Sequence, residues 1–532
     1  MMLLSPAPVS WYTLLGVGLA LPLILLIRDI AKWYRLPPGP LPIPFIGNRL
    51  PALRPWVHLQ QWSKIYGPIF TIWVGRQPTI VISDPKIAVD LMEKRSSKYS
   101  SRPRSVMMKE VYGSSSILLQ PYGKDWSTRR RLYHLGLTPA ALRSYKGRQQ
   151  AEATRLAFHI LHEPDRWERA LDRFAASVVF SIAYGHRIDS LDCPVVRDRL
   201  EIIRFLATLN TPGRYMAESF PILKHMPNFV APWEKYIQER GMIEATANMA
   251  LVEEVKRDIR MGKENGTEAA PSLTQNMLAV RDNEGLQISD RDLSYIPSGL
   301  FGAGSDTAAS TLCSTILALV THPGALEAAQ AEIDSEVGCA RMPTFEDEER
   351  LPYIRALVKE VLRWRPVAVL GGTPHATTGD DIYRGWYIPG GTAIMSNTWA
   401  MNLDEDYYPN PHLFNPARFL SESDPRYAPE LKGKKTHPAK NSLSSFGWGR
   451  RYCVGADLAL NSLFIALSKM IWAFDILPTT EYCTLEYTTV GSNIRPQPFE
   501  CQIRIRSDRH RRTLEGEKVL ADQEMEKFPA YD

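Results

Sequence analysis

The 532-residue chain has few cysteines, and their spacing suits neither a disulfide framework nor a zinc site. The six lie at positions 193, 313, 339, 453, 483 and 501, with no CxxC pair among them. An excess of one charge is also lacking, because 63 Lys and Arg residues face 58 Asp and Glu residues and leave a formal net charge of +5. So small a charge gives no reason to expect a nucleic-acid partner. The cysteine pattern fits a reducing compartment, and most of these side chains are expected to be small buried hydrophobes.

Beyond residue 45 the sequence also lacks an internal repeat and a long flexible linker. Apolar residues at three- and four-residue spacing predict helices, and β-branched segments around glycines predict small sheets. The expected helices are 147–162, 243–261, 292–320 and 324–336, and the expected strand regions are 68–84 and 380–401. Segments 261–272, 421–440 and the charged tail from about residue 507 have the composition of solvated loops. The body is therefore predicted to be one large, mainly α domain with small β-sheets.

Charge is absent from Trp11 to Ile27, a 17-residue apolar run that is followed closely by Arg28, Lys32 and Arg35. At about 1.5 Å of rise per residue, a helix of this length is near the lower limit for crossing a bilayer. No Lys or Arg precedes the run, so the positive-inside rule places the rest of the chain in the cytosol. A cleaved signal peptide would usually have a basic start and a shorter apolar stretch. Residues 1–35 are therefore predicted to be a membrane anchor, with a buried or interfacial helix as the alternative.

Five prolines between Pro37 and Pro44 follow the anchor. Because each ring fixes its own φ angle, this segment is expected to be stiff and extended. Residues 36–47 are predicted to be a hinge that holds the body at a fixed height over the membrane, with a turn-rich linker as the alternative. The domain boundaries that follow are 48–510 for the body and 511–532 for a charged tail.

The segment Ser444–Leu460, SSFGWGRRYCVGADLAL, places Cys453 in a turn with Gly447, Gly449 and Gly455. Glycine permits backbone conformations and close approaches that other residues do not. An apolar run with helical spacing follows directly, so Cys453 is expected near the N-terminus of a helix. Its position is therefore constrained by both the loop and the helix.

A helix N-terminus favours a thiolate, and Arg450 and Arg451 are expected to add positive charge beside Cys453. A stabilised thiolate presented to a flat partner suits an axial ligand to haem iron. A structural cysteine is the plainer alternative. The loop lacks the third glycine of a dinucleotide-binding turn, and a nucleophilic cysteine would need a histidine, which is not nearby in the sequence.

The pattern Phe446-x-x-Gly449-x-Arg451-x-Cys453-x-Gly455 matches in full the haem-binding signature of the cytochrome P-450 monooxygenases, which this chain resembles. The resemblance implies that Cys453 is the axial ligand to the iron of haem b, that Phe446 packs beside it, and that Arg451 pairs with a haem propionate. It covers the whole chain, and it implies the cytochrome P-450 fold with an N-terminal transmembrane anchor.

Further motifs appear in the order that the family implies. Glu360 and Arg363 lie three residues apart on one face of a predicted helix, which alone would suggest an ordinary surface ion pair. In this context they resemble the family's ExxR motif. The segment 414–419, FNPARF, resembles the following Pro-x-Arg-Phe element and would add Arg418 to a charged cluster behind the haem. Ala417 stands where a glutamate is often found.

The stretch LFGAGSDTAAS (300–310) places Gly302 and Gly304 within a predicted helix, where each costs about 1 kcal/mol relative to Ala. Small residues would let the helix pass close over a planar cofactor. The stretch resembles the family's AGxDT oxygen-activation motif, which implies Thr307 and Asp306 as the catalytic residues, Asp306 relaying protons. A close helix–helix crossing with a capping threonine is the alternative.

Trp126 and Arg130, at i and i+4, form the family's WxxxR pattern, which implies that both contact a haem propionate. A basic amphipathic helix is the plainer interpretation. The resemblance also extends to the strand region after ExxR, where a basic residue often meets the other propionate. His375 is the candidate for that role.

The resemblance implies a monooxygenase that uses O2 and electrons from NADPH, which a separate NADPH-dependent reductase would supply because this chain has no dinucleotide or flavin loop. A basic face is expected to dock an acidic partner domain. Its candidate residues are Arg129, Arg131, Lys432, Lys434, Lys435, Lys440 and Arg450.

The family's substrate-contact regions are apolar and aromatic in this chain, so a lipophilic small molecule is the expected substrate. They are 103–120, 205–235, 367–373 and 488–493, and they include Met107, Met108, Val111, Phe205, Phe220, Val369 and Leu370. The anchor, the proline segment and the cysteine loop look most similar to fungal microsomal members such as the O-methylsterigmatocystin oxidoreductase-like group. That similarity implies secondary metabolite biosynthesis and a single pass through the endoplasmic reticulum membrane with a cytosolic catalytic domain. Two alternatives stay open, namely a haem-thiolate isomerase or dehydratase that acts on peroxides without a reductase, and a non-catalytic membrane haem-binding protein.

Overall fold

A computed structural model describes residues 11–51, 53–209, 215–226, 233–479, 487–490 and 493–531. The helices are α1 (Trp11–Trp33), α2 (Pro55–Tyr66), α3 (Pro85–Ala88), α4 (Ser96–Tyr99), α5 (Val106–Tyr112), α6 (Lys124–Leu135), α7 (Pro139–His162), α8 (Trp167–Tyr184), α9 (Pro194–Leu209), α10 (Met216–Ser219), α11 (Trp233–Asn265), α12 (Leu273–Glu284), α13 (Asp290–Thr321), α14 (Pro323–Glu336), α15 (Pro352–Trp364), α16 (Thr398–Asn402), α17 (Ala456–Ala473) and α18 (Asp508–Met525). The strands are β1 (Ile69–Val74), β2 (Gln77–Ile82), β3 (His375–Ala376), β4 (Asp381–Tyr383), β5 (Trp386–Ile388), β6 (Ala393–Ser396), β7 (Phe474–Pro478), β8 (Tyr487–Val490), β9 (Asn493–Pro496) and β10 (Cys501–Ile505). The predicted mainly α fold with small sheets is confirmed.

Local capping explains where several long helices begin. The hydroxyl groups of Thr138, Ser272, Ser289 and Ser507 each accept a backbone N–H from the first turn of α7, α12, α13 and α18, respectively. Such a cap satisfies an N–H group that has no partner within the helix, and it contributes about 1 kcal/mol. The capping residues, which are not part of the apolar repeat, therefore set where these four helices begin.

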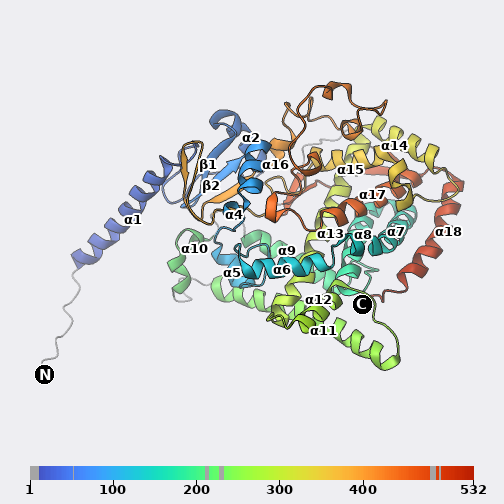
Figure 1. Cartoon of the computed structure of the whole chain (residues 1–532), viewed down its shortest axis with the longest axis horizontal. Helices are drawn as coiled ribbons and strands as arrows, with labels where there is room; N and C mark the ends of the chain where they lie inside the picture. The colour runs from blue at the N-terminus through green and yellow to red at the C-terminus, as the bar shows by residue number, and fades with distance from the viewer. Residues whose placement is uncertain are drawn as a thin grey trace.

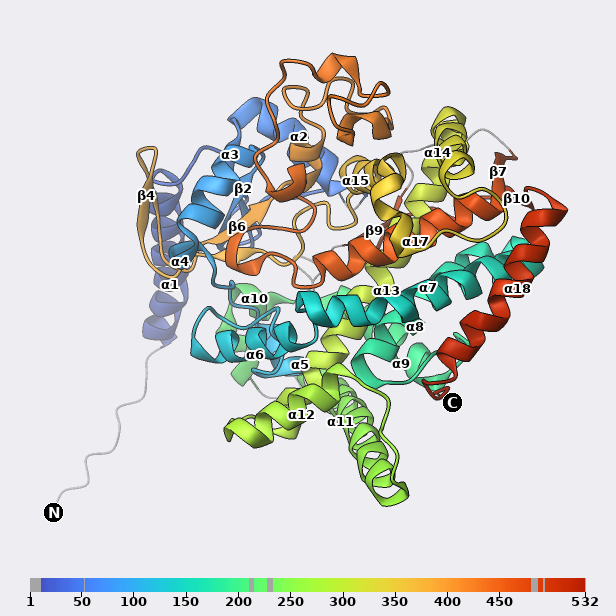
Figure 2. The same ribbon diagram turned by 45° about the vertical axis from the view of Figure 1, so that its right-hand side comes forward.

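The long helix α13 runs through the helical part of the body, where α8 packs along it and α17 also contacts it (Figure 2). The largest sheet, which contains β1 and β2, lies at the opposite end of the molecule, next to α1 and α2 (Figure 1), whereas the β7–β10 pair lies beside α18 (Figure 2). Helix α17, which follows the cysteine loop, is apolar on nearly all sides and almost fully buried. A helix that is apolar all round belongs in a core, so α17 fixes the loop before it to the centre of the body.

The segment predicted as two strands, 68–84, forms the antiparallel pair β1–β2, with Ile69 opposite Ile82. The region 380–401 supplies β4, β5, β6 and the short helix α16. Strand β6 pairs in parallel with β2, and β3 pairs antiparallel with β6, so the largest sheet has the order β1-β2-β6-β3. His375 lies in β3 and is thereby joined to the sheet.

The proline segment lies along β1. The Thr71 N–H donates to the Pro38 carbonyl over 2.9 Å, and Asn48 accepts the Trp73 N–H over 2.7 Å. A Cβ atom on Gly39 would lie 1.9 Å from the Thr71 carbonyl oxygen, so only glycine allows this close approach. The segment is extended, and it is hydrogen-bonded to the body.

Helix α1 projects away from the body, and its last turns are tied down by a bidentate pair between Asp29 and Arg76 (Figure 1). Among the described residues, α17 is the one single helix long and apolar enough to cross a membrane, and 78% of it is buried. In the predicted anchor (residues 1–35), the side chains at 11–19 and 21–22 of the apolar run lie outside the described set. The anchor therefore stays a prediction.

The expectation that the chain becomes a solvated loop from about residue 507 is wrong. Residues Asp508–Met525 form α18, which packs along α7 (Figure 2), and Leu514 and Met525 are buried. The apolar positions Leu514, Ala521 and Met525 recur at helical spacing, but the charged residues between them dominate the composition. The predicted boundary at residue 510 falls within the first turn of this helix.

Candidate functional site

The middle of α13 has accessible surface although the helix lies inside the body. Residues 302–307 are exposed or half-buried, whereas Phe301 before them and Ala308 after them are buried. Ala303 is the most exposed of the set. An interior helix shows such a window only where it borders an accessible space, so this stretch of α13 lines one.

Gly304 was expected to let the helix pass close over a planar cofactor, but its contacts are with α8. A Cβ atom on Gly304 would lie 2.5 Å from Cγ1 of Val179 on α8. Glycine is therefore required here by the close crossing of α13 and α8, which the sequence analysis kept as the alternative.

The cysteine loop has the tight backbone that its glycines suggest. Gly447 and Gly449 have φ angles of 78° and 53°, and a Cβ atom on Gly449 would lie 2.0 Å from the Met92 carbonyl oxygen. The Cys453 N–H donates to the Phe446 carbonyl over 2.8 Å, which closes the loop. Gly455 differs, since its φ of −91° is open to any residue.

Cys453 lies three residues before the start of α17, near the helix N-terminus as predicted, and it is exposed. Burial raises the pKa of its thiol, while the Gly455 N–H and the Arg130 guanidinium oppose that rise. We expected Arg450 and Arg451 to place positive charge beside this thiol. That expectation is wrong, because the cation that acts on the thiol is Arg130. Arg450 is exposed and donates to Ser96 Oγ.

Arg451 holds three separate backbone segments together. Its guanidinium donates to the carbonyls of Ser100, Ile117 and Gln120 over 2.8, 3.2 and 2.6 Å. It also lies over the ring of Trp126, 4.5 Å from the ring centre. Two of the predicted cofactor residues are thereby in direct contact.

Arg130 reaches the cysteine loop from α6. Its Nη2 donates to the Tyr452 carbonyl over 2.6 Å. Trp126, one turn earlier on α6, is buried, so the WxxxR pattern aims both side chains at the same region. The structure thus brings Cys453, Phe446, Arg451, Trp126 and Arg130 together.

His375 lies close to Arg451 of this group. Its Nδ1 donates to the Tyr99 carbonyl over 2.8 Å, and burial together with Arg102 and Arg451 lowers its pKa to about 3. In the neutral form, Nε2 is then an acceptor. A carboxylate brought close to His375 would raise this pKa and turn Nε2 into a donor.

Arg102 is a residue that sequence reasoning missed. It donates to the carbonyls of Leu118, Thr373 and Pro374 over 2.8, 2.6 and 2.8 Å. Burial lowers its pKa to about 10. The one available signal was an arginine directly before the segment 103–120, and no motif marks it.

Arg102, Arg130 and Arg451 form a cluster of positive charge. Burial and the charges of the other two arginines together lower the pKa of Arg451 to about 9. Within the described residues, none of the three makes an ion pair with a carboxylate. All three are half-buried and donate to backbone carbonyls, and half-buried cations without anionic partners favour an anionic ligand in this region.

The donor set fits haem b. A cofactor with two propionates would supply the carboxylates that these arginines lack, and a cysteine thiolate in a closed loop is a known kind of axial iron ligand. The exposed window on α13 offers small residues that a flat ring could approach. The residues present therefore suit the cofactor that the sequence resemblance implies.

The ExxR pair is buried. Glu360 and Arg363 have no exposed side-chain surface and are joined by two hydrogen bonds of 2.7 Å. Arg363 also donates to the carbonyls of Asn402 and Pro411, and Arg418 lies 3.6 Å from Glu360. The interpretation as an ordinary surface pair is excluded, and the predicted three-residue charged cluster exists.

Thr307 and Asp306 lie in the window of α13, but they make separate bonds. The Thr307 hydroxyl donates to the Ala303 carbonyl over 2.7 Å. Asp306 accepts a hydrogen bond from Asn493 on β9 over 2.9 Å. No hydrogen bond between Thr307 and Asp306 occurs in the described part of the chain.

The predicted substrate-contact residues lie in three separate places. Met107, Met108, Val111 and Phe205 join one apolar cluster over α5, α9 and α11. Val369 belongs to the main core, Leu370 packs against it, and Phe220 faces Phe45 and Arg76. Positions 210–214, 227–232 and 491–492 of these regions lie outside the described residues.

The predicted basic face loses one member. Arg129 is buried and forms an ion pair with Asp292 over 3.1 Å, because it lies on the face of α6 that packs toward α13. Arg131 is exposed and pairs with Glu284. Lys432, Lys434, Lys435, Lys440 and Arg450 are exposed.

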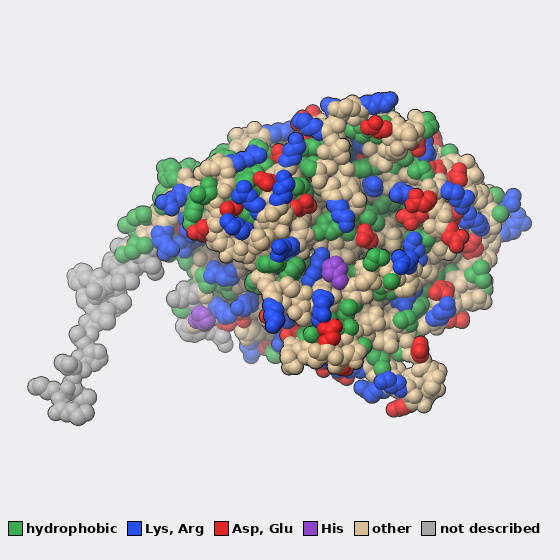
Figure 3. Space-filling view, viewed as in Figure 1, with side chains coloured by type: hydrophobic (Ala, Val, Ile, Leu, Met, Phe, Trp, Pro, Cys, Tyr) green, Lys and Arg blue, Asp and Glu red, His purple; other side chains and the backbone are tan. Residues whose placement is uncertain are grey.

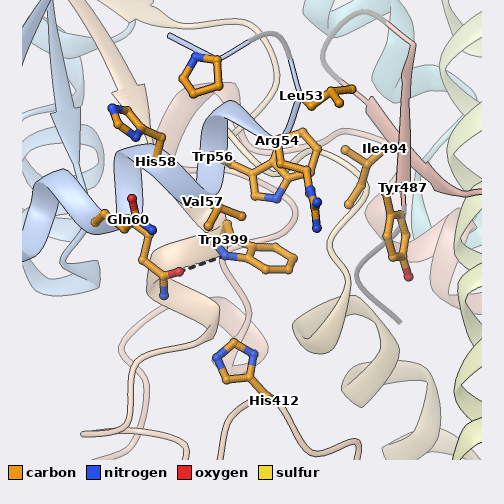
Figure 4. Close-up of a pocket in the computed structure, with 12 residues that line it drawn as sticks. Leu53, Arg54, Trp56, Val57, His58, Gln60, Trp399, His412, Tyr487 and Ile494 are labelled. Atoms are coloured by element: carbon orange, nitrogen blue, oxygen red, sulfur yellow. Dashed lines mark hydrogen bonds between the residues drawn. The ribbon is translucent and has the colours of Figure 1, made fainter. Parts of the chain in front are cut away.

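A separate pocket of about 370 Å³ lies between α2, α16 and the β8–β9 hairpin. Figure 4 shows Trp399 hydrogen-bonded to Gln60, with Tyr487 and Ile494 across the pocket from α2. None of the predicted site residues lines it. The pocket is therefore distinct from the region around Cys453.

Comparison with known proteins agrees with this geometry. The family model described as Cytochrome P450 matches residues 37–502. The chain is 36% identical over 505 residues to cytochrome P450 monooxygenase 253 of Postia placenta, covering 92% of this chain and 93% of that protein. It is 34% identical over 500 residues to a cytochrome P450 monooxygenase of Armillaria gallica, covering 92% and 94%. It is 32% identical over 523 residues to cytochrome P450 monooxygenase polD of Polytolypa hystricis, covering 97% and 98%.

The matched range, residues 37–502, includes the cysteine loop, the buried ExxR pair and the window of α13. Haem is the cofactor of this family, and its members act as monooxygenases on small molecules with electrons from a redox partner. The chain therefore belongs to the cytochrome P450 family and is a haem-dependent monooxygenase.

Proposed function

We propose that this monooxygenase oxidises a lipophilic small molecule in fungal secondary metabolism, anchored in the endoplasmic reticulum membrane and supplied with electrons from NADPH by a separate reductase. The observation that carries the catalytic part is the cluster of Arg102, Arg130 and Arg451, without a carboxylate partner among the described residues, beside the Cys453 loop. The alternatives, a peroxide isomerase or a non-catalytic haem protein, become outcomes of the tests below.

Cys453 would be the axial ligand to the haem iron, and Phe446 would pack beside it. Arg451, Arg130, Trp126 and His375 would hold the propionates, together with Arg102. The bound haem supplies the activation of O2 and the oxidation itself. The protein contributes the ligand, the charge of the arginine cluster and a site from which water is excluded.

Thr307 and Asp306 would deliver protons to the site. Because the Thr307 hydroxyl donates to Ala303, its oxygen lone pairs remain available as acceptors toward the space beside α13. Asp306, adjacent to it in the same half-buried stretch, would pass protons to that hydroxyl. A side chain that delivers protons to a fixed point favours product formation over release of hydrogen peroxide.

A lipophilic substrate is supported by the cluster that contains Met107, Met108, Val111 and Phe205. Methionine side chains adapt to irregular apolar shapes, and the aromatic ring adds contact area. Charged groups lie at the edge of this cluster, because the Arg240 guanidinium is 5.5 Å from the centre of the Phe205 ring and Glu218 accepts the Met107 N–H over 2.9 Å.

Membrane attachment is supported by α1. Its described apolar side chains Leu23, Ile24, Ile27 and Ile30 are each about half exposed, on a helix that projects from the body. Exposed apolar surface of this kind is typical of a segment that contacts lipid. The basic residues Arg28, Lys32 and Arg35 follow on the body side, as the positive-inside rule requires for a cytosolic domain.

The docking face for a reductase would use the exposed basic residues near the cysteine loop. Lys432, Lys434, Lys435, Lys440 and Arg450 lie in the segment that runs from the loop at the top of Figure 1 toward Cys453, and Figure 3 shows Lys and Arg side chains along that upper edge. Charge reversal at Lys434 and Lys435 should slow reduction of the haem at low salt, because positive charge steers an acidic partner. Unchanged reduction rates would contradict this docking face.

The ligand assignment is tested by Cys453→Ala. We expect loss of the thiolate-type absorption band of the reduced carbon monoxide complex, while the control Cys339→Ala, at a half-buried cysteine distant from the loop in sequence, keeps it. An unaltered band in Cys453→Ala would refute the assignment.

The proton role is tested by Thr307→Ala. We expect more hydrogen peroxide for each NADPH consumed, whereas the control Thr315→Ala removes a buried hydroxyl of the same helix and leaves that ratio unchanged. Product formation from an organic hydroperoxide without NADPH or reductase would favour the isomerase alternative.

A further inference from the structure

The pocket of about 370 Å³ between α2, α16 and the β8–β9 hairpin has walls that suit a flat apolar molecule (Figure 4). Trp56, Trp399 and Tyr487 supply aromatic surface, and Val57 and Ile494 supply aliphatic surface. The volume lies within the range of small-molecule sites, about 300–1,000 Å³. Among the described lining residues there is no Asp, Glu or Lys. The walls therefore favour a neutral, lipophilic ligand.

The pocket leads from the surface into the body. Leu53, Gln61 and His412 line it and are exposed, and Leu53 has 76% of its surface accessible. Trp56 and Ile494 line it and are buried. A lipophilic molecule can therefore enter from outside and cover the exposed Leu53 side chain while its other end contacts buried residues.

The aromatic wall is fixed before any ligand binds. Nε1 of Trp399 donates to Oε1 of Gln60 over 3.1 Å. Arg365 is buried beside these rings, with its guanidinium 5.3 Å from the centre of the Trp399 ring and 5.8 Å from the centre of the Tyr487 ring. Because the rings are held in place, a ligand loses little free energy in ordering them.

Two residues of the pocket are bonded to a segment that is expected to contact substrate. The Ile494 N–H donates to the Val367 carbonyl over 2.9 Å, and the Trp399 N–H donates to the Val369 carbonyl over 3.0 Å. Val367 and Val369 belong to the predicted substrate-contact region 367–373. The pocket and the expected substrate space therefore share a wall.

Strand β9 connects the pocket to the window of α13 as well. Adjacent residues of a strand point to opposite faces, so Ile494 lines the pocket while Asn493 donates to Asp306 of α13 over 2.9 Å. The strand also packs against α13. One strand thus has the pocket on one face and the α13 window on the other.

We infer that this pocket is a second binding site, which takes a neutral, flat, lipophilic small molecule and strengthens the binding of substrate. A ligand that packs against Ile494 and Trp399 from the outside favours the same position of the shared wall as a substrate that packs against it from the inside. Two ligands that favour one arrangement of a wall bind cooperatively, and each strengthens the other by the same factor. The inference rests on the proposed substrate contacts of 367–373 and 488–493.

The first measurement counts ligands on the full-length holoenzyme in lipid nanodiscs. Clotrimazole, a bulky azole that coordinates haem iron, is added to saturation so that the space beside the iron is filled. The probe is 1-aminoanthracene, which is flat and neutral at pH 7. Equilibrium dialysis, corrected with empty nanodiscs, should then show one aminoanthracene bound per protein.

The variant Val57→Phe places a ring inside the pocket. We expect roughly tenfold weaker binding of aminoanthracene, because extra atoms in an occupied space are strongly unfavourable. The matched control is Ile65→Phe on the same helix, at a residue that is 70% exposed and is not part of the pocket wall. That variant should bind aminoanthracene as the unmodified protein does. If Val57→Phe does not fold, Leu53→Ala at the exposed edge decides by a severalfold loss of affinity.

The second measurement tests the coupling between the two sites. Titration with clotrimazole is followed by the absorbance shift of the haem, with and without saturating aminoanthracene. The probe should lower the dissociation constant of clotrimazole roughly fivefold in the unmodified protein and in Ile65→Phe, and it should have no such effect in Val57→Phe.

Three results would overturn the inference: no stoichiometric binding, equal binding in the unmodified protein and in Val57→Phe or Leu53→Ala, and a clotrimazole affinity that the probe leaves unchanged or weakens, as a competitor for the same space would. The thiolate-type spectrum of the carbon monoxide complex is measured on the same samples. Its absence from the unmodified protein would refute the proposed function, whatever the dialysis shows.

Discussion

Nη2 of Arg130 donates a hydrogen bond to the backbone carbonyl of Tyr452 over 2.6 Å, which fastens α6 to the residue that precedes Cys453. The positive charge of the same guanidinium opposes the rise that burial causes in the pKa of the Cys453 thiol. One side chain therefore fixes the backbone of the cysteine loop and also sets the charge beside the sulfur.

Replacing Arg130 by Ala should weaken the retention of haem. A hydrogen bond from a charged group contributes about 1.5–3 kcal/mol, so we expect haem loss to be roughly ten- to a hundredfold faster. The rate of haem transfer to an excess of apomyoglobin measures this. The control Arg131→Ala removes the next arginine of α6, whose half-exposed partner is Glu284, and should leave the rate unchanged. Equal rates for the two variants would contradict the role given to Arg130.

The substitution Glu360→Gln should destabilise the fold strongly. It leaves Arg363 fully buried without its carboxylate, which costs about 3–5 kcal/mol in free energy of unfolding. The chain offers a matched control in Glu163→Gln, since Glu163 and Arg166 have the same i, i+3 spacing but are mostly exposed. That variant should lose less than about 1 kcal/mol. Denaturant unfolding of both proteins would show the difference, and similar losses would refute it.

Gly449→Ala should prevent the cysteine loop from forming. A φ angle of 53° costs a non-glycine residue about 1–3 kcal/mol, and the new Cβ atom would lie 2.0 Å from the Met92 carbonyl oxygen. We expect most of the haem content of the purified protein to be lost, as measured by the haem-to-protein absorbance ratio. Gly324→Ala, in the first turn of α14 where the added methyl group meets no neighbour, should keep full haem content. Normal haem content in Gly449→Ala would show that the loop can shift.

His437→Gln should flatten the pH dependence of stability. Burial lowers the pKa of His437 to about 4, whereas an unfolded histidine titrates near ~6.5. Below pH ~6.5 the unfolded chain therefore takes up a proton that the folded one does not, so His437 stabilises the fold above that pH and loses this contribution as pH falls toward ~4.

Gln keeps an acceptor for the Ala439 N–H but does not titrate. Between pH ~6.5 and ~4, His437 lowers the free energy of unfolding by about 3 kcal/mol, and the variant avoids this loss. His159 and His375, with pKa values lowered to about 4 and about 3, act in the same direction and should preserve part of the slope. Thermal unfolding at several pH values measures it, with the exposed His225→Gln as the control. A slope in His437→Gln equal to that of the unmodified protein would contradict the prediction.

Much of the helical core could be predicted from local spacing. The segments 147–162 and 292–320 lie within α7 and α13, because apolar residues at helical spacing must share one buried face. The tail after residue 507 shows where this reasoning fails. Its few apolar residues also have helical spacing, but only their burial against α7 distinguishes α18 from a charged loop.

In the candidate site, too, short-range contacts could be predicted from the sequence and long-range contacts could not. The contact between Phe446 and Cys453 and the pairing of Glu360 with Arg363 are short-range, so motif spacing was enough to predict them. The burial of Arg129 and the bond from Asn493 to Asp306 join segments far apart in the sequence. No local pattern distinguishes a buried arginine from an exposed one on the same basic helix.

The sequence by itself determined the cysteine loop, the helix that follows it, and the small residues of α13, because glycine φ angles and helical spacing act over a few residues. Only the tertiary structure decided which arginines gather beside the loop. Arg102 donates to the carbonyl of Thr373, which is 271 residues later in the chain. It belongs to a cluster of positive charge whose arginines come from separate segments. Electrostatic interactions depend on distance in space and on burial, and the packing of the whole chain sets both.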